Sequence, residues 1–306
     1  MNRTEYYKVA GHIFSLSLPD SQRLWNAISG QYDPFRIEAD DAESQAGPQG
    51  EGLLFSLEYV ESLPEESREC VYDVPTEDGE TVVKLYRQGS GWLFETAPDH
   101  RVPTVARILA TEDFRSAKIQ LASRLVRDAV FGINNAAMLL FAFASAEMST
   151  LEMHASVVEN AGKAYLFLGK SGTGKSTHSS LWLKYIEGSE LMNDDNPVVR
   201  AFPDGSVVAY GSPWSGKTPC YKNIQAPVGA FVQIRQCPEN RISRMSVIES
   251  YSSLFSSISG VKDDDSSMAD GLNASIDKVL SAVPCYLLDC RPDEEAAQLC
   301  AATVRQ

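Results

Sequence analysis

The chain has 306 residues, and its 27 Lys and Arg against 41 Asp and Glu give a formal net charge of −14. Hydrophobic residues make up 43 % and charged residues 22 %, which is typical of a folded protein and excludes collagen-like, mucin-like and wholly disordered chains. An acidic chain repels phosphate backbones and anionic lipids, so nucleic acid and membrane surfaces are poor partners. A small anion such as a nucleotide can still bind where the local charge is positive.

The cysteines and the apolar runs bear on the cellular compartment of the protein and on whether it spans a membrane. None of the six cysteines has a CxxC partner, and the chain opens without a charged-then-apolar signal segment. We therefore expect reduced cysteines and a cytoplasmic protein. The longest apolar run, 136–144, is far shorter than the ~20 residues of a membrane span, so we expect a buried helix there.

The first third of the chain favours β-strands. Short apolar-rich runs predict strands at 6–9, 12–18, 53–59, 81–87 and 92–96. The sequence Gln-Gly-Ser-Gly between the last two runs predicts a hairpin turn. Residues 39–52 are acidic, contain Gly and Pro and lack periodicity, which predicts a loop.

From about residue 105 the apolar spacing favours helices instead. One broad helical face can hold Ile119, Leu121, Leu125, Val126 and Val130. We therefore divide the chain near residue 145. The expected domains are an N-terminal β-rich then helical domain of unknown role, 1–145, and a second domain, 146–306.

Residues 169–176, GKSGTGKS, fit the phosphate-binding pattern GxxxxGK[ST]. The glycines let backbone N–H groups turn toward phosphate oxygens, Lys175 reaches the outer phosphates, and the Ser176 hydroxyl can ligate Mg²⁺. The expected nucleotide-binding residues are Gly169, Ser171, Gly172, Thr173, Gly174, Lys175, Ser176 and Thr177.

The same pattern occurs a second time at 211–218, so the context must decide between the two matches. The first match follows an apolar strand, 164–168, and leads into a helix-forming run, 177–186. The second contains Pro213, and the segment behind it lacks a helical apolar face. We interpret only the first as a phosphate loop, while Lys217 remains a candidate phosphate or substrate contact.

A strand predicted at 189–192 leads to Asp194 and Asp195. Strand, phosphate loop, helix and strand make a crossover unit with parallel strands, so both aspartates should lie at the same sheet edge as the loop. Adjacent strand residues face opposite ways, and we expect one aspartate on Mg²⁺ and the other as a base. We take Ser176 and Asp195 as the metal ligands, although the sequence does not decide between the aspartates. A surface turn before Asn-Pro is the alternative.

His154 precedes the loop on a predicted strand. A turn at 159–162 would join that strand to 164–168, and pairing of Val157 near Tyr165 would set His154 opposite Leu168, beside the phosphates. A purely structural histidine is the alternative, and we interpret His178 as structural.

The ordered set of His154-Ala155, the phosphate loop, Asp194-Asp195 and the PWSGK segment resembles the HPr kinase/phosphorylase-related proteins over roughly 150–300. The resemblance implies an α/β fold: a phosphoenolpyruvate-carboxykinase-like P-loop kinase domain with a mixed sheet, here after a β-rich α+β domain. It also implies ATP- and Mg²⁺-dependent transfer to a serine or other hydroxyl, with His154, Lys175, Ser176 and both aspartates at matching positions.

Family members that carry the PWSGK segment look like a divergent branch. The segment stands where the true HPr kinases carry a Gly-rich segment with a catalytic arginine, and Lys217 is a candidate replacement for that charge. This departure leaves open the HPr protein substrate and the reverse phosphorolysis reaction.

We expect phosphoryl transfer from ATP to a hydroxyl of a small molecule or a peptide serine. The alternative is a nucleotide-binding regulatory module without turnover. A simple NTPase is weaker, because no water-positioning residue is evident. The acceptor and the formation of a homo-oligomer stay open.

Overall fold

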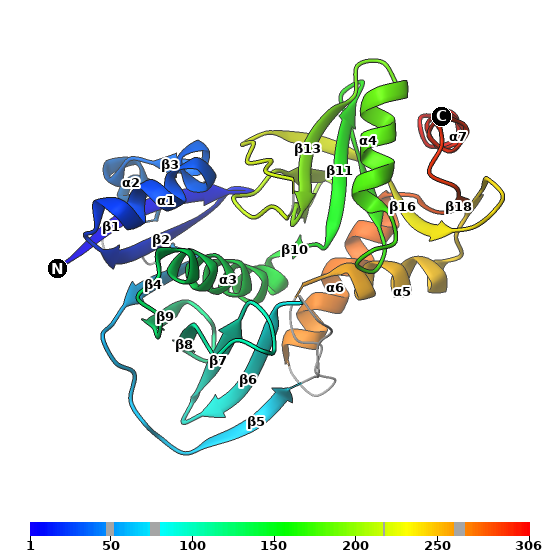
Figure 1. Cartoon of the computed structure of the whole chain (residues 1–306). Helices are drawn as coiled ribbons and strands as arrows, with labels where there is room; N and C mark the ends of the chain where they lie inside the picture. The colour runs from blue at the N-terminus through cyan, green and yellow to red at the C-terminus, as the bar shows by residue number, and fades with distance from the viewer. Residues whose placement is uncertain (47–51, 74–79, 217, 260–266) are drawn as a thin grey trace. The chain divides into compact units, whose positions relative to one another are not determined.

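The computed structural model describes residues 1–46, 52–73, 80–216, 218–259 and 267–306. The chain has a mixed α/β fold and divides into two compact units, Met1–Ala144 and Ser145–Gln306, each built on a mixed sheet (Figure 1). We call them the N-terminal unit and the C-terminal unit.

The sheet of the N-terminal unit has the order β3-β1-β2-β4-β9-β8-β7-β6-β5. Its strands are β1 (Asn2–Val9), β2 (His12–Pro19), β3 (Arg36–Ile37), β4 (Phe55–Tyr59), β5 (Arg68–Asp73), β6 (Val82–Gln88), β7 (Gly91–Ala97), β8 (Ala106–Ala110) and β9 (Ser116–Leu121). Its helices are α1 (Gln22–Tyr32), α2 (Ala39–Ala46) and α3 (Val126–Ser145). Among the strands of the described residues in this unit, β2–β4 and β4–β9 are the parallel pairs.

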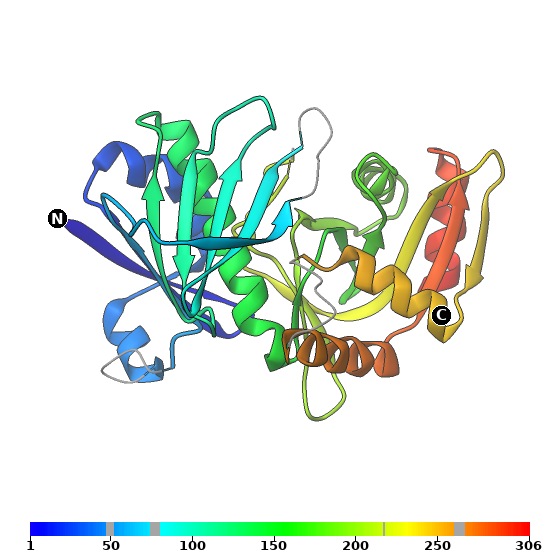
Figure 2. The ribbon, with the colours of Figure 1, turned by 90° about the horizontal axis from the view of Figure 1, so that it is seen from below.

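Helix α3 lies along this sheet (Figure 2). Its Phe141 packs edge-on against Phe14, and its Phe143 stacks on Phe114 at 4.7 Å between ring centroids. Among the described residues, one helix, Val126–Met148, is long and apolar enough to cross a membrane, and 72 % of its most apolar window is buried inside the protein. This burial agrees with the buried helix expected at 136–144.

The predicted strands and the hairpin turn of the first third are confirmed by β1, β2, β4, β6 and β7. The loop predicted at 39–52 is wrong for its first half, which forms α2, while 47–51 lie outside the described residues. Ala42 and Ala46, four residues apart, bury one face of that helix, and Asp40 and Asp41 complement the dipole of its first turn.

The helical interpretation from residue 105 is wrong up to 121. Residues 106–121 form the antiparallel strands β8 and β9, and Ile108 and Ile119 face each other across the pair. Burial in β8 alternates with the period of a strand, which short apolar runs do not distinguish well from a helical face. The helix begins only at Val126.

The sheet of the C-terminal unit has the order β10-β14-β15-β16-β12-β11-β13, with β18 beside β16 and β17. Its strands are β10 (Thr150–Glu152), β11 (Ala155–Asn160), β12 (Lys163–Leu168), β13 (Glu190–Asp195), β14 (Val198–Ala201), β15 (Val207–Tyr210), β16 (Gln225–Gln236), β17 (Arg241–Arg244) and β18 (Cys285–Cys290). Its helices are α4 (Lys175–Tyr185), α5 (Val247–Ser257), α6 (Ser267–Ala282) and α7 (Glu294–Val304).

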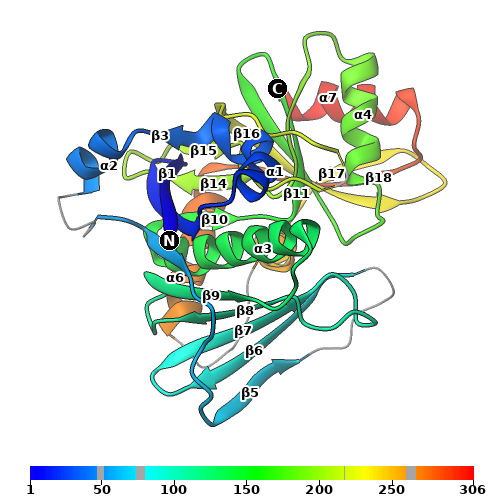
Figure 3. The same ribbon diagram turned by 60° about the vertical axis from the view of Figure 1, so that its left-hand side comes forward.

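Two apolar cores cover the two faces of this sheet. Leu254 of α5 and Ile276 of α6 belong to one core, and Trp182 of α4 and Cys300 of α7 belong to the other. Helices α4 and α7 accordingly lie side by side (Figure 3). All six cysteines are free thiols.

The predicted crossover unit is present with one difference. Strands β12 and β13 both pair antiparallel with β11, so they run parallel to each other but are separated by it. The predicted register is wrong by one residue, because Val157 pairs with Leu166 and Ala155 with Leu168. His154, the residue before β11, therefore lies just beyond the last pair of the β11–β12 ladder, level with the start of the phosphate loop.

Candidate functional site

The phosphate loop joins β12 to α4, and the glycines at its two ends, Gly169 and Gly174, adopt a positive φ. Gly169 has φ +145, and a Cβ there would lie 2.5 Å from Thr173 Oγ1. Gly174 has φ +104 and is the N-cap of α4. Because L side chains rarely adopt such φ values, glycine lets the loop turn sharply and present its N–H groups above the helix terminus.

Lys175, the first residue of α4, is only 8 % exposed. Its ammonium donates to Gly169 O at 2.8 Å and lies 2.8 Å from His154 Nε2. Burial lowers the pKa of Lys175, and the charges of Asp195 and Asp194 oppose that shift. The lysine is therefore a cation held at the base of the loop by neighbours that a phosphate oxygen could replace.

Asp194 faces the helix that follows the loop. Its Oδ1 accepts a hydrogen bond from Ser176 Oγ at 2.9 Å. Asp194 pairs with Ser156 across the strands, and the Ser156 hydroxyl lies 2.6 Å from that of Ser179 in α4. The face of β11 and β13 that carries Ser156 and Asp194 therefore points at α4.

Asp195 contacts a different group. Its Oδ1 lies 3.0 Å from His154 Nδ1, so Asp195, His154 and Lys175 form a continuous chain. Burial alone would raise the pKa of Asp195, but the hydrogen bonds of His154 and Asn196 and the charge of Lys175 hold it below its ordinary value. The carboxylate is thus ionised at neutral pH.

The backbone of Asp195 is strained. Asp195 pairs with Ala155, whose side chain lies in the apolar core on the opposite face of the sheet from Ser156. In a regular strand the Asp195 side chain would point into that same core. The observed φ of +124 is rare for a non-glycine residue. Strain of this kind persists where surrounding contacts enforce it, often at functional sites. The strained residue is the one whose carboxylate contacts His154, while Asp194 contacts Ser176 directly.

The segment 211–218, the second match to the phosphate-binding pattern, contacts this strained turn and stabilises it. Gly216 N and Ser215 Oγ both donate to Asp194 O at 2.8 Å, and a Cβ at Gly216 would lie 2.9 Å from Asp195 Cγ. Residues 218–224 contain no helix, in keeping with the expectation that this segment is not a phosphate loop. Lys217 lies outside the described residues.

Among the described residues, the predicted site residues His154, Lys175, Ser176, Asp194 and Asp195 come together, with one change of pairing. The hydroxyl of Ser176 is bonded to Asp194, whereas Asp195 is the metal ligand expected beside Ser176 from the sequence. Gly172, Thr173, Gly174 and Thr177 line a pocket beside the loop, and Ser171 is exposed.

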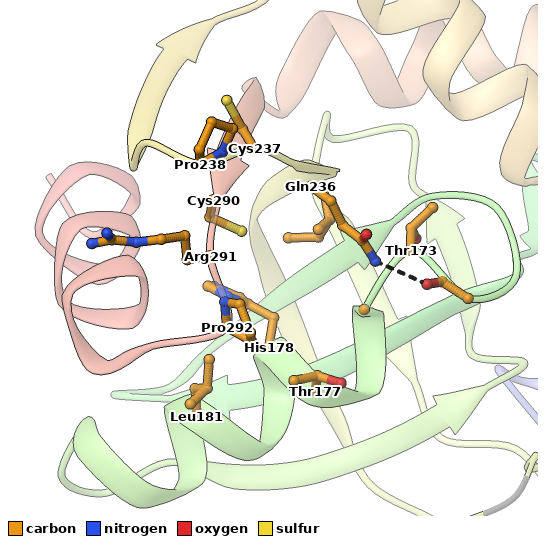
Figure 4. A pocket seen from close by; sticks show the side chains of 13 residues that line it. Thr173, Thr177, His178, Leu181, Gln236, Cys237, Pro238, Cys290, Arg291 and Pro292 are labelled. Carbon is orange, nitrogen blue, oxygen red and sulfur yellow. Dashed lines mark hydrogen bonds between the residues drawn. The ribbon is translucent and has the colours of Figure 1, made fainter.

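That pocket has a volume of about 560 Å³ and lies between the loop, α4 and the ends of β16 and β18 (Figure 4). Gln236 Nε2 donates to Gly172 O at 3.2 Å and so ties the end of β16 to the loop. The residues that line the pocket are Gly172, Thr173, Gly174, Thr177, His178, Leu181, Ile234, Gln236, Cys237, Pro238, Cys290, Arg291 and Pro292.

A metal ion would find two oxygen ligands here, Ser176 Oγ and the Asp194 carboxylate. The described residues contain no cluster of three or more His, Cys, Asp or Glu side chains that could hold an ion unaided. Mg²⁺ commonly takes one or two protein oxygens together with phosphates and water. The residues present fit an ion that arrives with a phosphate ligand.

Glu152 is a buried acid that sequence reasoning missed. It is 1 % exposed, and neither carboxyl oxygen has a hydrogen bond of acceptable geometry within the described part of the chain. Burial raises its pKa to about 8; Ser259 lowers the pKa, and the charge of Asp195 raises it further. The available signal was an acid two residues before His154.

No protein-family model matches the chain, and a search of the curated proteins finds no match. The site is therefore interpreted from its own geometry.

We predict that Glu152→Gln stabilises the protein at pH 8. The unfolded carboxyl titrates near its ordinary value of 4.5 and the folded one near 8, so the native state holds an extra proton between these values. Stability due to Glu152 therefore falls as the pH rises across that window. The variant should gain about 2 kcal/mol or more at pH 8 and little at pH 5, in urea unfolding. Glu187→Gln, an exposed control, should show no such difference; an equal effect of both variants at pH 8 would contradict the assignment.

Proposed function

We propose that the C-terminal unit transfers the γ-phosphoryl group of ATP to a hydroxyl group. The observation that carries this proposal is the series of contacts from Asp195 through His154 to Lys175, which stands at the end of the phosphate loop. A loop that only bound phosphate would need the lysine, but it would have no use for an ionised carboxylate joined to that lysine by a histidine.

Phosphate binding would use the loop and Lys175. The N–H groups of the loop and of the first turn of α4 would surround the phosphate oxygens, where the helix dipole also favours negative charge. Lys175 would exchange its bond to His154 for a phosphate oxygen, since the ammonium donates more strongly to an anion than to a neutral ring.

Ser176 and Asp194 would hold Mg²⁺ beside the phosphates. When bound, the ion would supply positive charge against the phosphate oxygens of the reactant. Their existing hydrogen bond keeps the two side chains at a common position. The assignment of Asp194 rather than Asp195 to this role follows from that contact.

Asp195 would orient the acceptor hydroxyl. The hydroxyl oxygen forms a bond to the γ-phosphorus as the bond from that phosphorus to the β–γ bridging oxygen breaks, and ADP leaves. The hydroxyl proton passes to the Asp195 carboxylate, which His154 holds in position. Catalysis of this kind consists mostly of positioning and charge neutralisation.

The geometry also supports the resemblance to the HPr kinase/phosphorylase-related proteins and a phosphoenolpyruvate-carboxykinase-like P-loop fold for the C-terminal unit. The supporting features are the order His154, loop, aspartate pair and PWSG segment, and their contacts around one loop. On this proposal the protein acts in the cytoplasm on a small molecule or a peptide serine, and Lys217 is a further candidate for charge on the transferring group.

We predict that Lys175→Ala weakens ATP binding at least tenfold and abolishes transfer. Charge-assisted hydrogen bonds contribute about 1.5–3 kcal/mol, and 1.4 kcal/mol corresponds to a factor of ten. Isothermal titration with a non-hydrolysable ATP analogue measures the affinity. Lys184→Ala, an exposed lysine on the same helix, is the matched control. Native affinity in the Lys175 variant would overturn the phosphate-loop assignment.

We predict that substitution of Asp194 and of Asp195 changes different properties of the enzyme: the Mg²⁺ dependence in one case and the transfer rate in the other. Asp194→Asn should raise the Mg²⁺ concentration needed for activity, and excess Mg²⁺ should restore part of the rate. Asp195→Asn should leave nucleotide and metal binding near normal and lower transfer by about 10²–10⁴-fold. ATP turnover is measured against Mg²⁺ concentration, with and without hydroxyl acceptors, and Asp204→Asn is the control.

Three outcomes of this experiment would contradict the proposed roles. Exchange of the two phenotypes would reverse the roles of the aspartates. Unaltered rates in both variants would make the pair a structural turn. ATP binding without any turnover would favour a regulatory module over a kinase.

A further inference from the structure

The outermost strand on one side of the C-terminal sheet, β17, has backbone groups without a partner. Among the described strands it pairs with β18 alone, in the antiparallel direction (Figure 3). Met245 N donates to Cys285 O at 3.0 Å, one step beyond the pair of Arg244 with Tyr286. Backbone bonds in an antiparallel ladder involve every second residue, so the N–H and C=O groups of Ile242 and Arg244 point away from β18. No described residue bonds to these groups.

The free edge of β17 carries two arginine charges that the protein only partly neutralises. Arg241 and Arg244 are both exposed. Asp289, opposite Arg241 in the ladder, is engaged by Arg235, whose Nη2 donates to its Oδ2 at 2.7 Å. The guanidinium of Arg244 lies over the Tyr286 ring, 5.5 Å from its centroid, and has no carboxylate partner in the described part of the chain. The edge is therefore locally positive, although the whole chain has a net charge of −14.

Two further carboxylates near the start of β17 already have partners. Asn240 Nδ2 donates to Asp293 Oδ1 at 3.0 Å and to Glu295 Oε2 at 2.7 Å. The guanidinium of Arg291 forms ion pairs with the same two carboxylates. Glu239, in the turn before β17, is exposed and lies outside the strand. These acids therefore leave the charge of the two β17 arginines available to a partner.

The two charges also restrict what can pair with the edge. A second copy of β17, added antiparallel in a symmetric register, would set Arg241 opposite Arg244, and like charges directly opposite destabilise a strand pair. An acidic strand would instead place carboxylates opposite both arginines. Val247 and Ile248, which begin α5 directly after this segment, are each 80 % exposed and offer apolar contact area to the same partner.

We propose that the free edge of β17 binds an extended, acidic segment of another protein as an added antiparallel strand. Backbone bonds to Ile242 and Arg244 would hold the segment, and the antiparallel direction is the slightly more stable one. Because Arg241 and Arg244 are three residues apart, the segment needs two carboxylates with the same spacing, in the pattern Glu-x-x-Glu. Cross-strand pairs of opposite charge then form at both positions.

The first test measures the binding of a labelled peptide to the full chain by fluorescence anisotropy at low salt. The probe is Thr-Val-Glu-Thr-Val-Glu-Val-Thr, capped at both ends. Replacement of both Glu by Lys should weaken binding about tenfold or more, because attraction becomes repulsion at two positions. Exchange of the second Glu with the Val before it keeps the composition but sets the spacing to two, and should weaken binding about threefold.

A charge-swapped variant controls for folding. Arg241→Glu combined with Arg244→Glu should bind the Glu peptide about tenfold more weakly than the native protein does, and should bind the Lys peptide more tightly. A gain of affinity for the Lys peptide shows that the variant is folded. Arg124→Glu combined with Arg127→Glu changes two exposed arginines of the N-terminal unit with the same spacing, and should alter neither affinity.

Hydrogen exchange of the native protein tests the strand edge itself. The amide protons of Ile242 and Arg244 should exchange about tenfold or more slowly when the Glu peptide is bound, because they become bonded. The amide proton of Ser243 already bonds to β18 in the alternating ladder, so its exchange should not change.

Four outcomes would overturn the proposal. Equal affinity for the Glu and Lys peptides, or no binding of either, removes the acidic partner. Unchanged exchange at Ile242 and Arg244 with the Glu peptide bound places that peptide elsewhere. Slow exchange at these two amides that depends on protein concentration, without any peptide, assigns the edge to a second copy of the chain. The probe contains no nucleotide, so none of these outcomes depends on the proposed function.

Discussion

The chain of contacts from Asp195 through His154 to Lys175 is the interaction on which the candidate site depends. It joins the end of β13, the residue before β11 and the first turn of α4, which are far apart in the sequence. A buried ammonium is costly unless it is paired, and here Asp195 and Asp194 supply the compensating charge. The phosphates of a nucleotide would supply the same compensation, so ligand binding on the proposed function replaces one set of partners of Lys175 with another.

The second loop makes this arrangement rigid. Ser215 and Gly216 hold the carbonyl of Asp194, and Gly216 packs so closely on Asp195 that a methyl group would not fit without movement. Behind them, Asn193 Nδ2 donates to Ser212 Oγ and to Trp214 O within the core. A positive φ at Asp195 is tolerable because these contacts surround it. The repeated GxxxxGK[ST] pattern thus has two physical meanings in one chain: one copy presents N–H groups above a helix, and the other supports a strained turn.

Local patterns were enough to predict the strand, loop and helix around Lys175, because glycine positions, an apolar strand and the run behind it all act over short distances. They also indicated that Asp194 and Asp195 differ in role. They are insufficient for 106–121, where short apolar runs fit a helical face as well as a strand, and for the register of β11, where a shift of one residue depends on pairing across the sheet. The pairing of Ser176 with Asp194 depends on the register between β11 and β13, and the strained φ of Asp195 is likewise not visible in the sequence. The spacing of four residues on a helix indicates that His178 and Trp182 are neighbours, but the hydrogen bond between them and the burial of His178 are seen only in the structure.

The most direct test of the central claim is a crystal structure of the chain with a non-hydrolysable ATP analogue and Mg²⁺. We predict the triphosphate in the loop of residues 169–176, with Lys175 Nζ moved from His154 Nε2 onto an outer phosphate oxygen. We also predict the metal ion on Ser176 and Asp194, and the Asp195 carboxylate still bonded to His154 and facing the γ-phosphate. A nucleotide bound elsewhere, or a loop that binds it while Lys175 keeps its bond to His154, would contradict the proposed function.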